Sequence, residues 1–293
     1  MNISIFTKGI IFASMGSLWW GIIGTIYFEY FTFIGHLELV IHRCIWTALV
    51  LIITVTLFNK WNIFLNIITN KRNLFILFFT GLLIFSNWSV WIYAVSSNKI
   101  ISASFGYFIM PIINVFFGYI FFNEKINSSR FISIIIVFIA IFFLLIFDYR
   151  SIPYIGIFLA IVWSLYNLLR KKINIDTEIG LLIESLFILP FALFGFYLIY
   201  VSGFNDFSLS NMKLIPLLML AGPMTVIPLF LFIKGFEYSG LGPSGMIFFI
   251  TPTCHFLLGY FYYEEPFSFL NFISFSLIWI AVTIYLKNLY EEK

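Results

Sequence analysis

Ten runs of about 20 mostly apolar residues follow one another along the chain, separated by short polar connections. A helix needs about 20 such residues to cross the hydrocarbon core of a bilayer, because each residue rises 1.5 Å. Strands of a membrane barrel are about ten residues long and alternate strictly, which these runs do not. The pattern predicts an all-α integral membrane protein with ten transmembrane helices. The predicted spans are 8–28, 38–58, 74–97, 101–122, 131–147, 153–170, 177–201, 214–235, 242–263 and 269–286.

The composition agrees with a lipid environment. Hydrophobic residues make up 62% of the 293 residues and charged residues 10%, against about 45–50% and about 25% in soluble globular proteins. So few charges disfavour a soluble enzyme, a disordered chain and a nucleic-acid-binding protein. Cys44 and Cys254 lie in apolar runs and give no disulfide framework.

The placement of the 16 basic residues predicts the direction of the spans. With the amino terminus in the cytoplasm, twelve of them fall on the cytoplasmic side and three on the outer side, and Arg43 lies within a span. This asymmetry fits the positive-inside rule, so both termini are expected in the cytoplasm of a bacterial inner membrane. The twelve are Lys8, Lys60, Lys71, Arg72, Lys125, Arg130, Arg170, Lys171, Lys172, Lys234, Lys287 and Lys293, and the three are Lys99, Arg150 and Lys213.

The second half of the chain repeats the first. A shift of 141 residues aligns 101–145 with 242–286 without gaps, and twelve of the 45 positions match, among them Pro111 with Pro252 and Glu124 with Glu265. The repeats are 1–147 and 148–293. Five spans per repeat is an odd number, so the second repeat is expected to enter the membrane from the opposite side. Two inverted five-helix repeats are the architecture of many secondary transporters, since mirrored halves exchange inward-open and outward-open shapes.

Two ionisable residues lie within predicted spans, Arg43 and Glu184. An ionised group in lipid is costly, so such residues mark a functional cavity or a paired structural site. Each lies about five residues from its span centre, and the inversion separates their backbones by roughly 15 Å in depth. We therefore expect separate roles, with Arg43 in an outer vestibule and Glu184 in an inner one. The alternative is structural pairing with backbone groups or tyrosine hydroxyls.

Other polar or kinked positions lie near mid-depth. The repeat pairs Asn114 with His255, each close to a proline that frees a helical carbonyl. His255 titrates near neutral pH when unperturbed, although a lone histidine is more often a satisfied hydrogen-bonding group. Central tryptophans pack against neighbours or line a cavity. The further candidates for the substrate pathway are Trp20, Asn87, Trp88, Tyr107 and Tyr166, and the candidate helix breaks or hinges are Pro111, Pro190, Pro228 and Pro252.

The sequence gives no convincing match to the motifs of soluble enzymes. No Walker A sequence is present, and 240–245 satisfies G-x-G-x-x-G only by letter, after a membrane helix rather than a strand. Ser244 and His255 lie about 16 Å apart along one helix, too far for a serine–histidine pair. No Cys/His spacing suggests a metal site, and we expect no cofactor and no catalytic residues. An intramembrane enzyme and a non-transporting structural membrane protein are the alternatives.

Several segments resemble the RarD (chloramphenicol-sensitivity protein) family of the EamA-type drug/metabolite transporter superfamily. They lie in family order over nearly the whole chain, and the Gly-Tyr-Phe…Pro…Asn and Leu-Ile-Glu…Leu-Pro strings are the most specific. The segments are His42–Trp46, Asn87-Trp88, Ser102–Asn114, Glu124, Tyr166, Arg170–Lys172, Gly180–Pro190, Ala221-Gly222 and Pro252-Thr253.

The resemblance implies a ten-helix EamA fold and transport of small metabolites or drugs across the inner membrane. The chain departs from the family pattern at Glu29, Phe248-Phe249 and His255, near the expected pathway, so substrate identity is not carried over. We expect alternating access for a small polar or amphipathic substrate, with proton coupling and exchange as the two alternatives for its energetics. Arg43 is expected to attract a carboxylate or phosphate, and Glu184 an amine or a coupling proton. The sequence does not predict the oligomeric state.

Overall fold

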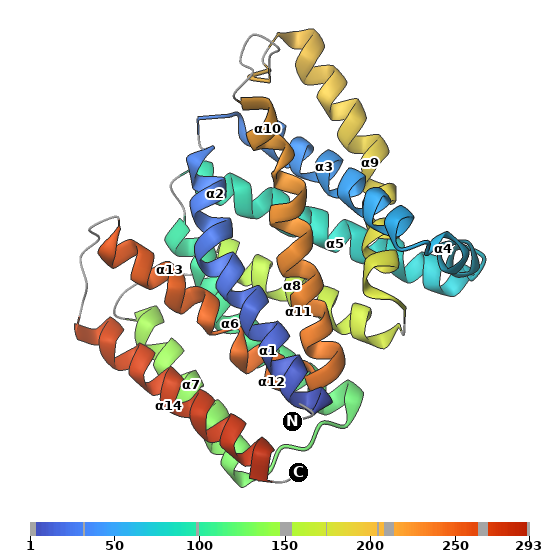
Figure 1. Ribbon diagram of the computed structural model, residues 1–293. Helices are drawn as coiled ribbons and strands as arrows, with labels where there is room; N and C mark the ends of the chain where they lie inside the picture. The colour runs from blue at the N-terminus through green and yellow to red at the C-terminus, as the bar shows by residue number, and fades with distance from the viewer. Residues whose placement is uncertain are drawn as a thin grey trace.

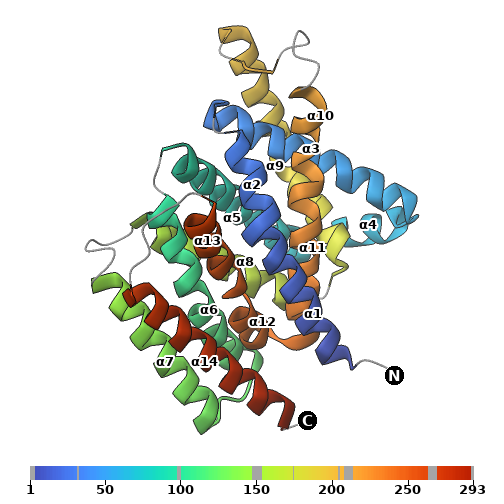
Figure 2. The same ribbon diagram turned by 60° about the vertical axis from the view of Figure 1, so that its left-hand side comes forward.

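The computed structural model describes residues 4–31, 33–97, 100–146, 154–173, 175–203, 205–207, 214–262 and 269–291. Its regular elements are all helices, as the apolar runs predict (Figures 1 and 2). In chain order they are α1 (Ile5–Leu18), η1 (Trp19–Gly24), α2 (Thr25–Tyr30), α3 (His36–Leu57), α4 (Trp61–Ile68), α5 (Lys71–Ser96), α6 (Ile100–Phe122), α7 (Ser128–Leu144), α8 (Tyr154–Lys172), α9 (Thr177–Ser202), α10 (Leu214–Met219), α11 (Ala221–Ser239), α12 (Leu241–Ile247), α13 (Ile250–Phe261) and α14 (Phe269–Glu291).

Every predicted span overlaps a helix, and several details differ from the prediction. The first span contains the π-helical turn η1, and the eighth is divided between α10 and α11. The connection after the second span contains an additional two-turn helix, α4, which is amphipathic and has no buried residue. The ninth span is not one helix, because α12 ends at Ile247 and α13 begins at Ile250. Among the basic residues placed by sequence, Lys99, Arg150, Lys213 and Lys293 lie outside the described residues, as does Glu265.

Among the residues that the structure describes, six helical stretches are long and apolar enough to cross a bilayer: Ile5–Tyr30, His36–Leu57, Lys71–Ala94, Thr177–Ser202, Leu214–Ser239 and Phe272–Glu291. The outer surface of the bundle is strongly apolar as well. On α7, for example, Phe131, Phe138 and Phe142 are 57–60% exposed. Soluble proteins seldom expose apolar patches of this extent, because contact with water disfavours them. The chain is therefore a multi-pass membrane protein.

The helices form one bundle with a smaller helix pair at its edge. The pair α7 and α14 packs together on one side in both views (Figures 1 and 2). In the main bundle α1 packs on α11, α3 on α9, and α8 on both α5 and α6. The approach of α1 to α11 needs small residues, because a Cβ on Gly235 would meet the Ala13 backbone at 2.9 Å. Close backbone contact is the usual way in which membrane helices gain packing energy.

Two backbone irregularities lie opposite each other in the bundle. Residues Trp19–Gly24 form a π-helical turn between α1 and α2, and Phe248–Phe249 separate α12 from α13. Pro252 lacks an N–H for the Phe248 carbonyl, which instead accepts a hydrogen bond from the Thr251 N–H at 2.9 Å. The Thr251 hydroxyl donates to the Ser17 carbonyl at 3.0 Å. The second bond joins the last turn of α1, just before the π-turn, to the first turn of α13, just after the break. Turns of the π type occur frequently at functional sites.

Candidate functional site

A cavity with about 460 Å³ of unfilled space, open solvent at its mouth included, lies beside the two irregular segments. Its walls come from both halves of the chain, from η1, α2, α3, α5, α6, α8 and α13 and from Phe248 at the break before α13. Four of its residues are half-buried, namely Trp20, Thr25, Tyr107 and His255. The complete lining is Trp20, Gly24, Thr25, Phe28, Arg43, Asn87, Trp88, Trp91, Tyr107, Trp163, Phe248, Thr251 and His255.

Arg43 of α3 is the charged group of the cavity. Its side chain is held by packing and by one hydrogen bond, from Nε to the Thr225 hydroxyl of α11 at 3.0 Å. The guanidinium carbon lies 4.5 Å from the centre of the Trp88 ring and 4.6 Å from that of Phe28. Among the described residues no carboxylate forms an ion pair with Arg43. Arginine stays protonated in proteins, so this side of the cavity carries an unbalanced positive charge.

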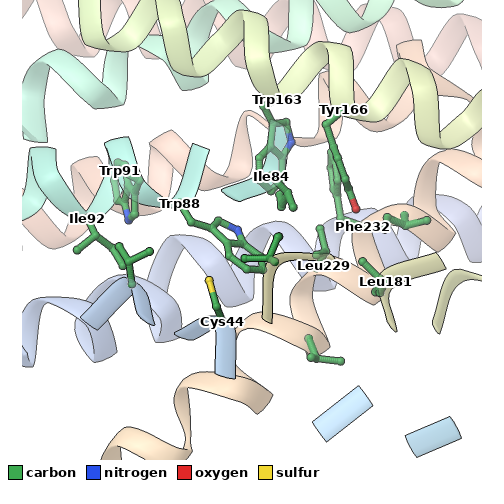
Figure 3. Packing of buried hydrophobic residues seen from close by; sticks show 14 of the residues in the cluster. Cys44, Ile84, Trp88, Trp91, Ile92, Trp163, Tyr166, Leu181, Leu229 and Phe232 are labelled. Carbon is green, nitrogen blue, oxygen red and sulfur yellow. The ribbon is translucent and has the colours of Figure 1, made fainter. Parts of the chain in front are cut away.

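Aromatic rings form most of the remaining wall. Trp20 meets Trp163 edge to face at 4.9 Å and Phe248 at 6.4 Å. Tyr107 contacts Phe248 at 5.7 Å and Trp91 at 5.2 Å. Figure 3 shows Trp88 and Trp91 projecting from α5 and Trp163 from α8 within the same buried cluster. We call Trp20, Trp163, Phe248, Tyr107 and Trp91 the aromatic cage, because their rings contact one another in a continuous series.

His255 closes the cage at α13. Its ring stacks on Trp91 at 5.9 Å with an interplanar angle of 18° and lies 5.7 Å from Tyr107. The Trp20 backbone hydrogen-bonds the ring, whereas Nδ1 has no hydrogen-bond partner in the described structure. The structure does not support a serine–histidine pair, because the Ser244 hydroxyl hydrogen-bonds with the Ser239 hydroxyl at 3.0 Å.

Glu184 lies outside this cavity, in a separate buried cluster. The carboxylate accepts hydrogen bonds from Thr80 at 2.7 Å and Tyr166 at 3.2 Å. The Arg170 Nε lies 3.4 Å from Oε1, and both side chains are at most 2% exposed. We call Thr80, Tyr166, Arg170 and Glu184 the buried ion cluster. The geometry matches the structural-pairing alternative for Glu184 more closely than an open inner vestibule.

Arg170 is the cation of this cluster, and its burial was not foreseen from the sequence. The sequence placed it among the basic residues on the cytoplasmic side, because it begins the Arg-Lys-Lys triplet at the end of a span. The structure buries its guanidinium between α8 and α9, where Nη2 donates to the Thr177 carbonyl at 3.3 Å. A Cβ on Gly180 would collide with the same guanidinium, so the glycine leaves the space that Arg170 fills. The following Lys171 reaches Glu124 at 2.7 Å.

Of the nine predicted pathway residues, six line the cavity: Trp20, Arg43, Asn87, Trp88, Tyr107 and His255. Glu184 and Tyr166 belong to the buried ion cluster. Asn114 lies elsewhere on α6, where its amide contacts the Met110 sulfur at 2.8 Å and approaches Asn167 at 3.5 Å. The repeat pairs Asn114 with His255 in sequence, but only His255 reaches the cavity.

The four prolines predicted as helix breaks or hinges lie in two kinds of position. The helices continue through Pro111, Pro190 and Pro228, whereas Pro252 directly follows the break between α12 and α13. Membrane helices tolerate proline, since neighbouring groups satisfy the freed carbonyl. A hinge at the three continuous helices remains a prediction.

Sequence reasoning missed several lining residues and one partner. Trp91 follows Trp88 by three residues and so shares its helix face, which was a usable signal. Phe28, Trp163 and Thr225 gave no comparable signal in a chain with 40 phenylalanines. As for metals, no group of three or more His, Cys, Asp or Glu residues is placed to bind an ion in the part of the chain that the structure describes.

Comparison with known proteins shows which family the chain resembles. The model of the EamA-like transporter family matches residues 7–146. An uncharacterized transporter of Vibrio cholerae is 32% identical over 280 residues, which cover 95% of this chain and 91% of the relative. This chain belongs to the EamA-like transporter family. The resemblance read from the sequence motifs is thereby confirmed.

Further relatives show a similar extent of similarity, and one of them carries the RarD name. The Escherichia coli protein RarD is 29% identical over 281 residues, covering 96% of this chain and 94% of the relative. The uncharacterized transporter YojE of Bacillus subtilis is 32% identical over 95% of this chain and 93% of its own length. A crystal structure of another protein shares the fold, with a TM-score of 0.68 and 13% identity over 94% of this chain and 96% of that one. Family membership supports a membrane transporter rather than an enzyme.

Proposed function

We propose that this chain is a secondary transporter of the bacterial inner membrane that moves a small metabolite by alternating access. The observation that carries the proposal is the cavity between the two halves of the chain, where a buried arginine without a carboxylate partner faces an aromatic wall. Unpaired ionisable groups inside a membrane protein are costly unless a ligand or water meets them. In this proposal Arg43 binds an anionic group, while Trp20, Asn87, Trp88, Tyr107 and His255 line the site.

The helix contacts support two inverted five-helix repeats within 1–147 and 148–293. The α1–α11 contact has its counterpart in α8–α5, and the α6–α8 contact has its counterpart in α12–α1. The α3–α11 contact likewise corresponds to α9–α5. Three further pairs join equivalent helices: α3 with α9, α6 with α12 and α7 with α14. Such a contact pattern, unchanged on exchange of the halves, is what a pseudo-two-fold axis produces.

In the proposed orientation both termini are cytoplasmic, and the cavity lies in the outer half of the membrane. Charged contacts close the opposite end. Glu124 accepts hydrogen bonds from the Leu241 and Gly242 N–H groups at 2.8 Å and pairs with Lys171. Lys60 pairs with Asp176 and Glu178, and the hydrogen bond to Glu178 raises the pKa of Lys60. We infer that these pairs and the buried ion cluster form a cytoplasmic closure that must open during transport.

The transport proposal is tested in proteoliposomes that contain the full chain. A defined panel of radiolabelled carboxylates, phosphates, amines and neutral aromatics is offered from outside. We expect saturable uptake of at least one anionic member above that of protein-free vesicles, and loss of that uptake in Arg43→Ala with the variant still monodisperse in detergent. Equal uptake by Arg43→Ala and the unaltered chain would remove the assigned role of Arg43. No uptake of any panel member would favour the non-transporting structural alternative.

A further inference from the structure

We propose that the cavity selects an organic monoanion attached to a flat aromatic ring, and that it discriminates against cations of the same shape. The proposal rests on the transport function above and specifies its substrate class. It comes from three properties of the lining: the sign of its charge, the surplus of hydrogen-bond donors, and the arrangement of the rings.

The charge of the lining is positive and unbalanced. Arg43 is the permanently charged residue among the thirteen lining residues, and none of the thirteen is acidic. Glu184, the carboxylate that the sequence predicted within a span, already interacts with Arg170, Thr80 and Tyr166. An anion entering the cavity therefore completes an ion pair that the protein leaves open. One guanidinium binds one carboxylate through a bidentate pair of hydrogen bonds, so the cavity favours a ligand with a single negative charge.

The hydrogen-bonding groups agree with an anionic ligand. The terminal Arg43 nitrogens have no acceptor in the described structure, because only Nε donates, to Thr225. The indole N–H groups of Trp88 and Trp163 are buried without a partner. By contrast, the hydroxyls of Thr25 and Thr251 already donate to the Trp20 and Ser17 carbonyls. Unpaired buried donors are unfavourable, and carboxylate oxygens accept from several of them at once.

The rings set the shape of the ligand. In the aromatic cage, Trp20 and Trp163 meet edge to face and Trp91 is stacked with His255. Flat rings pack in offset or edge contacts with such walls. His255 Nδ1 adds one unpartnered acceptor beside Trp91, which suits an N–H on the ring of the ligand. Indole-3-acetate combines these features and is the probe of choice.

Aromatic cages also attract cations, so the two electrostatic effects must be weighed. Desolvated cation–π contacts improve affinity by about 30-fold. Repulsion between Arg43 and a second positive charge about 6 Å away lowers it by about 100-fold at an effective dielectric constant of roughly 20. The guanidinium already occupies the Trp88 and Phe28 faces. Repulsion therefore prevails, and a cationic ligand is disfavoured.

The test is calorimetric titration of the full chain in detergent with indole-3-acetate, indole-3-acetamide and tryptamine, which share the ring and differ in charge. We expect the anion to bind about tenfold or more tightly than the neutral amide, and tryptamine to bind more weakly than either. Arg43→Gln is expected to remove the difference between acetate and acetamide, whereas Arg43→Lys keeps the order. Lys287→Gln is the matched control, since it removes a positive charge from an exposed side chain of α14 and is expected to change nothing.

The comparison of the three probes uses the unaltered chain, so it decides the proposal even if a variant fails to fold. Tryptamine binding as tightly as indole-3-acetate would overturn it, as would an absence of indole-3-acetate binding. Uptake into proteoliposomes separates this proposal from the transport function. Binding of the anion without uptake of any ligand would support the charge selection and contradict transport. Uptake of tryptamine in preference to the anion would support transport and contradict the charge selection.

Discussion

Removal of the Glu184 carboxylate charge is expected to destabilise the protein strongly, because it leaves Arg170 buried and unpaired. The Arg170 guanidinium is 1% exposed and its Nε lies 3.4 Å from Glu184 Oε1. Neither Nε nor Nη1 of Arg170 has a hydrogen-bond partner in the described structure, and Nη2 has the Thr177 carbonyl. The carboxylate charge is thus the principal compensation for this cation. Breaking a buried ion pair from one side costs about 3–5 kcal/mol.

That range converts to a measurable shift in melting temperature. Each kcal/mol corresponds to roughly 2–4 °C for chains of about 150–250 residues, so Glu184→Gln is expected to lower the melting temperature by roughly 6–20 °C. Thr80 and Tyr166 donate to different carboxylate oxygens, so glutamine keeps a carbonyl acceptor for one of the two hydroxyls and removes the charge together with the other acceptor. Glu184→Ala is expected to lower it further, since both hydrogen bonds are lost as well. The double variant Arg170→Met with Glu184→Gln is expected to recover part of the loss, because no buried charge remains.

The assay is thermal unfolding of purified protein in one detergent, followed by size-exclusion chromatography of the heated samples. Glu291→Gln on α14 is the matched control, as its pair with Lys287 has side chains 62% and 74% exposed. Exposed pairs contribute about 0–1 kcal/mol, so this control is expected to shift little. The reasoning is refuted if Glu184→Gln melts within 2 °C of the control, or if the double variant is no more stable than Glu184→Gln alone.

Three further perturbations follow from individual contacts. Gly21→Val is expected to separate η1 from α13 and to weaken ligand binding, because a Cβ there would lie 2.6 Å from the Cys254 Cβ; unchanged calorimetric affinity for indole-3-acetate would speak against this geometry. Phe138→Asp, at a position 60% exposed on α7, places a charge costing about 2.5–3.5 kcal/mol in lipid, so membrane-inserted protein should fall in fractionation, whereas normal insertion would place this face outside the bilayer. Glu124→Gln is expected to weaken the cap on α12 and the pairing with Lys171, increasing labelling of a Ser244→Cys variant, at a buried position of α12, from the cytoplasmic side; equal labelling would argue against a closure there.

The sequence predicted the helical segments well because bilayer crossing imposes one simple rule on length and polarity. Each of the ten runs overlaps a helix, and six of them are long, clear spans. The rule does not describe local deviations. The π-turn at Trp19–Gly24 and the break at Phe248–Phe249 lie where α13 packs against η1 and α1, and no single segment encodes that packing. The helix α4 is an amphipathic helix without buried residues, too short to be found as a membrane span.

The site was predictable in part for a similar reason. Polarity at depth singled out Arg43, Asn87 and His255, which line the cavity. Polarity within a span also singled out Glu184, but it did not reveal that Glu184 pairs with Arg170. Arg170 sits beside two lysines at a span end, where snorkelling to the membrane surface is the usual behaviour, and only the approach of α8 to α9 shows that it turns inward. Trp20, Trp88 and Tyr107 were predicted and line the cavity, whereas Phe28 and Trp163 are not distinguished in sequence from the many rings that face lipid.

The most direct test of the central claim is two-sided access to the cavity. In a background with Cys44→Ala and Cys254→Ala, Thr25→Cys introduces one thiol at a half-buried lining position. Membrane-impermeant maleimide is applied to right-side-out and to inside-out vesicles. The account predicts labelling from the outer face, and slower labelling from the cytoplasmic face that increases when the inner closure is weakened by Glu124→Gln. A thiol that reacts from one face only under every condition, or from neither, would contradict alternating access.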